Sequence, residues 1–244
     1  MSAAAGPPPR ASEPVLPAGE QAQLLPEAVR NATVLVTGAT GGLGPAVVAA
    51  FLEDGWRVVA PSRSGRPPQD LVGSDRLESV ATADQENAPL RALVNLVGGY
   101  AIGGLVHETP IQQFERQLTL NLRPTYLVTQ AVLPHLVDAG GGAIVCMSAR
   151  AAVAPFRGAG GYVSAKAAVL AFAQAVAVEY RPAGVRCNAV LPSVIDTPAN
   201  RAAQPNADTS KWVPPEQVAA VIRFLCSDDS APTSGAAIPV YGRA

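Results

Sequence analysis

Hydrophobic residues along this chain follow two patterns, and the two alternate. Short runs rich in Val, Ile and Leu are typical of strands buried on both faces of a parallel sheet, and they occur at 33–37, 56–60, 92–97, 143–147 and 185–191. Longer stretches carry apolar residues at helical spacing, and they occur at 45–53, 110–137, 162–180 and 214–227. Weaker strand patterns lie at 77–80 and 234–240. Strands that alternate with helices predict a single α/β domain with a parallel sheet.

The predicted helix 110–137 contains three residues that disfavour helix. Pro124 and Pro134 predict a bend and an end, because proline lacks the N–H that a helix needs. Asn121 is a poor helix former, so we interpret it first as a capping or bend residue.

Composition narrows the class of protein. The chain has 244 residues, of which 48% are hydrophobic and 15% charged, which fits one domain with a full core. A net charge of -1 gives no electrostatic basis for binding nucleic acid or an anionic membrane. We find neither a signal-peptide pattern nor an apolar run of membrane-spanning length, so we expect a cytoplasmic protein.

Cysteine and histidine usage points away from a metal site. The three cysteines, Cys146, Cys187 and Cys226, are far apart in apolar surroundings and predict buried thiols. With only two histidines in the chain, we expect no zinc site and no other bound metal.

The N-terminal segment differs from the rest of the chain. Residues 1–30 are rich in Ala and Pro and show no periodicity, so we expect a disordered or loosely docked arm. A partner-binding tail is the alternative. The folded domain is expected over residues 31–244.

A glycine-rich turn follows the first predicted strand. The run Gly38-Ala39-Thr40-Gly41-Gly42-Leu43-Gly44 leads directly into a helical stretch. Glycines in this context allow a pyrophosphate to approach backbone N–H groups at a helix N-terminus. The motif predicts a dinucleotide site, and a plain glycine turn is the alternative.

The end of the second strand bears on which dinucleotide binds. An acidic residue there bonds the ribose 2′-hydroxyl of NAD, whereas a basic one accommodates the 2′-phosphate of NADP. This chain has Ser62-Arg63-Ser64-Gly65-Arg66 and no acid at that point. We therefore predict NADP(H) over NAD(H), with Arg63 as the main phosphate contact; two solvated loop arginines are the alternative.

The fourth strand carries one polar residue and ends in glycines. Asn95 lies inside the apolar run, so its side chain should hydrogen-bond either a neighbouring strand or a ligand. Gly98 opens the stretch Gly-Gly-Tyr-Ala-Ile-Gly-Gly, in which backbone can approach a ligand closely.

Tyr162 and Lys166 are the main candidates for catalysis. They lie four residues apart in a predicted helix, so they share one face. A positive charge beside a phenol lowers its pKa, which would make Tyr162 a usable proton donor. A surface pair at this spacing is the alternative.

These motifs, in this order, resemble those of the classical short-chain dehydrogenases/reductases. The family's glycine motif matches Thr37 to Gly44, its Y-x-x-x-K matches Tyr162 and Lys166, and its helical Asn matches Asn121. The resemblance implies a Rossmann-type doubly wound sheet of about seven strands in the order 3-2-1-4-5-6-7. It also implies a small-molecule substrate and a homodimer or homotetramer joined through the two long helices.

The resemblance also implies roles for individual residues. Tyr162 would protonate the product, Lys166 would hold the nicotinamide ribose, and Asn121 would anchor a relay water. Val194 and Thr197 would meet the carboxamide. Together, the motifs and the resemblance assign cofactor binding to Gly38, Thr40, Gly42, Leu43, Gly44, Ser62, Arg63, Asn95, Gly98, Tyr162, Lys166, Pro192, Val194 and Thr197.

The chain departs from the family at the serine that orients the substrate. That serine usually lies thirteen residues before the tyrosine, where this chain has Ala149, while Ser148 lies fourteen before. A one-residue loop difference would let Ser148 serve, so it is our fourth catalytic candidate. The sequences of this loop, of residues 98–104 and of residues 191–201 are similar to those of dihydropteridine reductases.

The substrate therefore stays open between a ketone, a 3-oxoacyl thioester and a pterin-like C=N system. A protein that binds NADP(H) without turnover, as a sensor or an inactive oligomer partner, is the alternative function.

Overall fold

The computed structural model describes residues 32–61, 77–78 and 88–243. The N-terminal arm and the candidates Ser62 and Arg63 therefore lie outside the described residues. In the described part of the chain, seven strands form one parallel sheet. They are β1 (Thr33–Thr37), β2 (Arg57–Val59), β3 (Leu77–Glu78), β4 (Leu90–Asn95), β5 (Gly142–Met147), β6 (Val185–Pro192) and β7 (Ala237–Val240).

The order of the strands confirms the predicted doubly wound topology. The sheet runs β3-β2-β1-β4-β5-β6-β7, with β1 paired to β2 on one side and to β4 on the other. The chain therefore reverses its direction of winding between β1 and β4. In open α/β sheets, ligands bind in the crevice outside the carboxyl ends of the strands at such a switch point.

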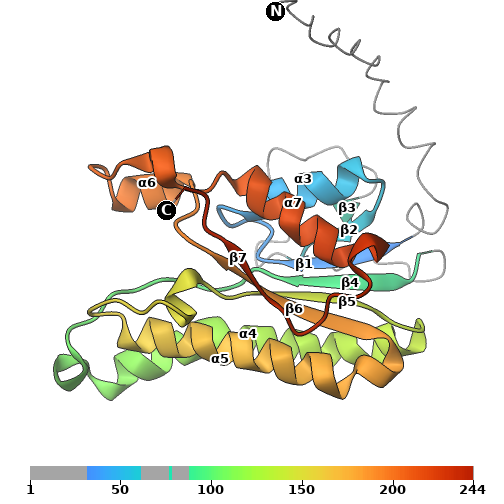
Figure 1. Cartoon of the computed structure of the whole chain (residues 1–244), viewed down its shortest axis with the longest axis horizontal. Coiled ribbons are helices and arrows are strands. Elements are labelled where there is room, and N and C mark those ends of the chain that lie inside the picture. The colour runs from blue at the N-terminus through green and yellow to red at the C-terminus, as the bar shows by residue number, and fades with distance from the viewer. Residues whose placement is uncertain (1–31, 62–76, 79–87, 244) are drawn as a thin grey trace, which may run out of the picture.

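Helices cover both faces of the sheet (Figure 1). Helices α3 (Gly44–Glu53) and α7 (Pro215–Cys226) lie together on one face, and α4 (Ile111–Asp138) and α5 (Gly160–Glu179) lie together on the other. A short helix, α6 (Pro198–Ala203), follows β6 and was not predicted from the sequence. It marks the end of the molecule at which the strands finish (Figure 1).

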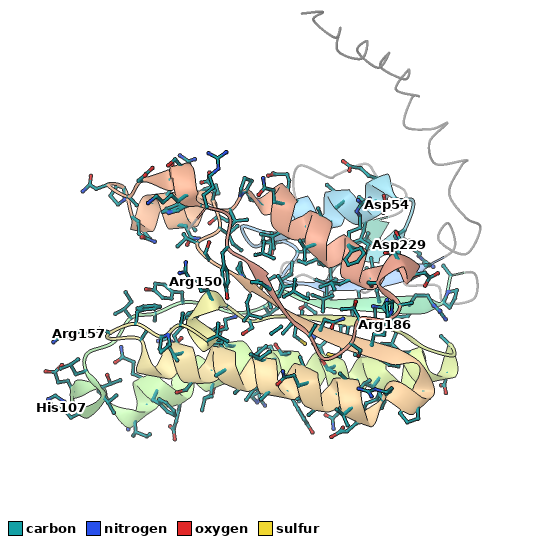
Figure 2. All side chains as sticks on the ribbon, viewed as in Figure 1. Asp54, His107, Arg150, Arg157, Arg186 and Asp229 are labelled. Carbon is teal, nitrogen blue, oxygen red and sulfur yellow. The ribbon has the colours of Figure 1, made fainter. Side chains whose placement is uncertain are left out.

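Charged residues help to locate the two ends of the sheet (Figure 2). Arg150 and Arg157 lie toward the carboxyl ends of the strands, whereas Arg186 lies toward the amino ends. On the α3/α7 face, Arg223 donates to Asp54 at 2.6 Å and joins the two helices.

Helix α4 corrects one prediction. It contains Pro124 and does not end at Pro134 but runs on to Asp138, close to the range 110–137 that its hydrophobic spacing predicted. The reason is burial: Leu133 and Leu136 in this last part of α4 pack against the sheet. Their burial outweighs the hydrogen bond that the proline removes.

Helix α5 corrects a second prediction. By length and composition it is apolar enough to cross a membrane, which we did not expect from the sequence. Its position speaks for a core helix, because Val169, Ala173 and Ala177 are buried between the sheet and α4. The three cysteines are free and buried, as predicted.

Candidate active site

The glycine-rich turn has the backbone that a dinucleotide site requires. Gly38 has φ +73°, a conformation that L side chains rarely adopt. A Cβ on Gly44 would collide with the carbonyl of Ala39, so only glycine lets α3 start this close to the turn. Thr40 and Gly42 are exposed on the turn, whereas Leu43 is buried beneath it.

The N-terminus of α3 is open to an anion. No side chain caps it, and its first turn carries no acidic residue. The positive end of its dipole is the feature that binds pyrophosphate in this fold. The turn and helix therefore fit a dinucleotide.

The end of β4 brings two catalytic candidates together. A Cβ on Gly98 would lie 2.8 Å from Asn121 Oδ1 and 3.2 Å from Lys166 Nζ. The N–H of Gly99 donates to Asn121 Oδ1 at 3.1 Å. Asn121 is thus a buried link between α4 and the loop after β4, which corrects its interpretation as a cap or bend residue.

Tyr162 and Lys166 project from the first two turns of α5 toward this loop. Lys166 Nζ donates to the carbonyl of Met147 at 2.9 Å and lies 5.9 Å from the centroid of the Tyr162 ring. Tyr100, from the loop after β4, meets the Tyr162 ring edge-on with 5.0 Å between centroids. The structure therefore gathers Tyr162, Lys166 and Asn121 at the carboxyl end of the sheet.

The electrostatics of this pair contradict one prediction. Burial, and to a smaller extent the neighbouring Tyr100 phenol, raises the pKa of Tyr162 to about 12. Burial lowers the pKa of Lys166 to about 8, against an opposing effect of Cys146. The expectation that Lys166 lowers the pKa of Tyr162 is thus wrong for this structure, because desolvation by burial is the largest influence on the phenol. Tyr162 is a neutral phenol at neutral pH.

Ser148 lies near the cluster but is fully engaged within the fold. Its hydroxyl is 2% exposed and donates to the main-chain carbonyl of Lys166 at 2.7 Å. The adjacent Ala149 has no polar side chain to offer. In this geometry Ser148 fastens the end of β5 to α5, and its hydroxyl does not face a substrate.

Asn95 is also held inside the protein. Its Nδ2 donates to Thr129 Oγ1 on α4 at 3.0 Å, so the side chain points into the layer between sheet and helix. Asn95 Oδ1 has no hydrogen-bond partner among the described residues. The sequence allowed either a structural hydrogen bond or a ligand contact, and the structure shows the structural one. Asn95 Nδ2 bonds to the neighbouring strand, at Cys146 Sγ of β5, as well as to α4.

The loop after β6 closes the site opposite α5. Pro192 is the last residue of β6, and Val194 is half-buried in the loop that follows. Thr197 Oγ1 accepts from the N–H of Asn200 and so caps α6. A Cβ on Gly42 would lie 2.9 Å from Thr197, which places this loop against the glycine-rich turn.

Two residues of this region were not identified from the sequence. Tyr100 stacks on Tyr162, and a single aromatic among glycines at the end of a strand is the signal that could have found it. Gln117 is buried on α4 one turn before Asn121, and its position in the sequence carries no such signal.

The fold and this cluster together define a class of protein, a Rossmann-type dinucleotide-binding oxidoreductase. Comparison with known proteins agrees. Residues 68–242 match the family described as "Enoyl-(Acyl carrier protein) reductase". Over 240 residues the chain is 31% identical to 2-(R)-hydroxypropyl-CoM dehydrogenase from Xanthobacter autotrophicus, covering 85% of this chain and 96% of that protein.

Solved structures are similar over the same region. One is a short-chain dehydrogenase/reductase family oxidoreductase from Burkholderia thailandensis, 30% identical with TM-score 0.75, over 87% of this chain and 92% of that one. Another is ElxO with NADP bound, 25% identical with TM-score 0.77, over 87% of this chain and 98% of that one. The chain belongs to the short-chain dehydrogenase/reductase family and is an NAD(P)-dependent enzyme. A dihydropteridine reductase is not among these relatives.

Proposed function

We propose that the protein is an NADP(H)-dependent oxidoreductase that reduces a small-molecule carbonyl or a pterin-like C=N, with Tyr162 as the proton donor. The observation that carries this proposal is the cluster of Tyr162, Lys166 and Asn121 at the switch point of the sheet. The glycine-rich turn beside it fits the dinucleotide. When bound, the reduced nicotinamide supplies a hydride.

The protonation state of Tyr162 favours the reductive direction. As hydride adds to the carbonyl carbon, the C=O π electrons move onto oxygen, which takes the proton of Tyr162 Oη. An alkoxide is far more basic than a phenolate, so a phenol with a pKa of about 12 still gives up its proton. The resulting phenolate regains a proton from solvent. Oxidation would first require deprotonation of this buried phenol.

The preference for NADP(H) rests on the sequence at the end of β2. The strand ends at Val59, and Arg63 follows four residues later with no acidic residue between them. We expect Arg63→Ala to lower the NADPH/NADH affinity ratio roughly 10- to 100-fold, because a charge-assisted contact to the 2′-phosphate is lost. Arg66→Ala should change the ratio less. An unchanged ratio in Arg63→Ala, from fluorescence titration, would remove this assignment.

The surroundings of Tyr162 favour a flat ring as the reducible group. Tyr100 is 53% exposed and stands edge-on to Tyr162, and Phe156 is 6.4 Å from Tyr100 between centroids. Exposed aromatic rings beside a reactive group offer faces on which a planar substrate can stack. With Ala149 at the position of the usual serine, a substrate oriented by stacking suits the site better than one oriented by a hydroxyl.

The engaged hydroxyl of Ser148 also favours the second candidate function, a protein that binds NADP(H) without turnover. One assay separates the two. Purified protein is tested for loss of the near-ultraviolet absorbance of NADPH against simple ketones, a 3-oxoacyl thioester and a quinonoid dihydropterin. We expect turnover, fastest with the dihydropterin. No turnover with the full panel, in protein that binds NADPH tightly, would favour the non-catalytic function.

Tyr162→Phe tests the proton donor directly. Removal of one hydroxyl should lower kcat by ~10²–10⁴-fold while NADPH affinity and the unfolding temperature stay near wild type. Tyr126→Phe, on the exposed side of α4, is the matched control and should leave kcat unchanged. Turnover that survives in Tyr162→Phe would mean that another group protonates the product.

We also propose a homodimer or homotetramer assembled through α4 and α5. Tyr126 and Phe172, one from each helix, are in ring contact and line a hollow of about 460 Å³ on this side. Size-exclusion chromatography coupled to light scattering measures the oligomeric state. A monomer at micromolar concentration would contradict the proposal.

A further inference from the structure

A small cavity lies between the first turn of α5 and the N-terminal half of α4, beside Tyr162. Its volume is about 20 Å³, and its lining includes Gln117, Phe114, Gly161 and Tyr162. A cavity of this size holds one water molecule, for which about 10–15 Å³ suffices, and nothing larger. It is separate from the glycine-rich turn, whose residues do not line it.

One wall of the cavity presents a hydrogen-bond acceptor. Gln117 is 4% exposed, and its Oε1 has no hydrogen-bond partner among the described residues. A buried amide oxygen without a partner costs about 1–3 kcal/mol. The other polar residues on the same stripe of α4, Asn121, Thr125 and Thr129, all have hydrogen-bond partners.

The opposite wall presents donors. Helix α5 begins at Gly160, and its N-cap residue Ala159 provides no side-chain bond. The first N–H of this turn that reaches a carbonyl is that of Val163, which donates to Ala159 at 2.8 Å. The N–H groups of Gly161 and Tyr162 precede it and have no intrahelical acceptor.

Gly161 is what brings the two walls close. A Cβ at this position would lie 3.2 Å from Gln117 Cγ and 3.4 Å from Phe114 Cα. Glycine therefore lets the start of α5 pack directly against Gln117. The residues that carry the acceptor on α4 and the donors on α5 line the same cavity. Neither the acceptor nor these donors have a hydrogen-bond partner there among the described residues.

We propose that one buried water molecule donates to Gln117 Oε1 and accepts from the N–H groups of the first turn of α5, and that Gln117 thereby positions Tyr162. A water both donates and accepts, as this pair of walls requires. A chloride would meet the same N–H groups but would be repelled by the amide oxygen. No bond to the water changes during the reaction, so Gln117 is a positioning residue.

Gln117 also connects this water to the rest of the site. Its main-chain carbonyl accepts from Asn121 Nδ2 at 3.0 Å, and Asn121 Oδ1 accepts from Gly99 N–H. The side chain of Gln117 thus fixes the start of α5, while its backbone fixes Asn121. One residue sets the distance between the proton donor and the loop that carries Tyr100.

The first experiment looks for the water itself and uses the wild-type protein. A high-resolution crystal structure should show a water within ~3 Å of both Gln117 Oε1 and the nitrogen of Gly161 or Tyr162. Water–amide cross-relaxation in NMR should show the same contact in solution. A dry cavity in the crystal structure would overturn the proposal.

The second experiment replaces Gln117 and does not depend on turnover. Gln117→Met removes the acceptor at similar length and should speed amide hydrogen exchange of Gly161 and Tyr162 roughly fivefold to tenfold. Gln117→Glu keeps an acceptor oxygen and should restore protection. Gln112→Met, exposed on the first turn of α4 and outside the lining of the cavity, is the matched control and should exchange like wild type. Equal exchange in Gln117→Met and Gln112→Met would refute the role.

The effect on activity rests on the function proposed above. We expect Gln117→Met to lower kcat several-fold with little change in the KM for NADPH, and Gln117→Glu to recover part of it. If Tyr162→Phe is fully active, the proton-donor proposal fails while the exchange result still decides whether the water site exists. If Tyr162→Phe is inactive and Gln117→Met has wild-type kcat, the positioning role fails alone.

Discussion

The two faces of the sheet are covered by buried layers of different polarity. Against α3 and α7 the buried layer is apolar, with Val34, Val36, Phe51, Ile222 and Leu225 at its centre. Against α4 and α5 the layer is also largely apolar, and its apolar residues extend to Cys146 and Leu191 near the carboxyl ends of β5 and β6. Toward the carboxyl ends it contains buried polar side chains, which are Asn95, Gln117, Asn121, Thr125, Thr129 and Lys166.

The polar residues of α4 are regularly spaced. Gln117, Asn121, Thr125 and Thr129 follow one another at intervals of four, so they form one stripe that faces the sheet. The last turns of the same helix bury Val132, Leu133 and Leu136 instead. From its N-terminus to its C-terminus, helix α4 thus changes from a helix that lines the site to one that packs in the apolar core. The comparison indicates that one face of the sheet mainly stabilises the fold. On part of the other face, polar side chains that position the site residues replace apolar ones.

Phe51→Ala gives the largest expected effect on stability. Phe51 is fully buried and packs edge-on against Trp56 with 5.4 Å between centroids. Loss of such a side chain costs ~3–5 kcal/mol of unfolding free energy. Urea unfolding followed by circular dichroism measures it. The exposed Phe224→Ala is the control and should cost less than about 0.5 kcal/mol. Similar losses in both variants would contradict the apolar-face assignment.

Lys166→Met should raise the free energy of unfolding, whereas Phe51→Ala lowers it. The pKa of Lys166 is about 8 in the folded protein against an ordinary 10.5, because burial disfavours its charge. At pH 7 the charged form is buried at a cost, so the Met variant should unfold about 2 kcal/mol less readily, after the lost bond to Met147 is deducted. The same variant should lose turnover.

The pH dependence of that effect gives its control. Between pH 8 and 10.5 the unfolded state binds the proton and the folded state does not, so wild-type stability rises with pH. The advantage of Lys166→Met should therefore shrink across this range. The only other lysine of the chain, Lys211, is exposed, and Lys211→Met should show neither the gain nor the pH dependence. A destabilised, pH-independent Lys166→Met would refute the argument.

Thr129→Val should give the smallest effect. It removes the oxygen that accepts from Asn95 Nδ2 and leaves that nitrogen with only the long, weak bond to Cys146 Sγ at 3.9 Å, at a cost of ~1–2 kcal/mol. Adding Asn95→Leu should recover part of the loss, because both partners are then apolar. Thr119→Val, exposed on the same helix, controls for helix propensity. A double variant that loses the sum of the two single losses would show that no buried pair is shared.

Local patterns were enough to predict most of the fold. The strand at Thr33–Thr37 was placed at its observed bounds, because a β-branched run between polar residues leaves little choice of element. The order of the strands followed from the resemblance to a known family, whose motifs occur here in the family's order. Helix α6 was missed, because six residues in a polar segment carry too weak a periodicity.

What the sequence could not show depends on packing between elements. The spacing of Tyr162 and Lys166 predicted a shared face correctly but gave the wrong direction for the pKa of Tyr162, since burial is invisible to spacing. Ser148 stood at a plausible distance from Tyr162, yet its hydroxyl is taken by a carbonyl on α5. In the sequence Gln117 is an ordinary helical glutamine, because its burial depends on α5, which packs over it.

Gly98 has a consequence for how this protein and its relatives could lose their chemistry in evolution. One added methyl group there would meet Asn121 Oδ1 and Lys166 Nζ at 2.8 and 3.2 Å. Such a change would separate two site residues while every motif used to recognise the family remained intact. A homologue with a side chain at this position would therefore be a candidate pseudoenzyme. It would fold and be classified correctly by its sequence, but it would be catalytically inactive.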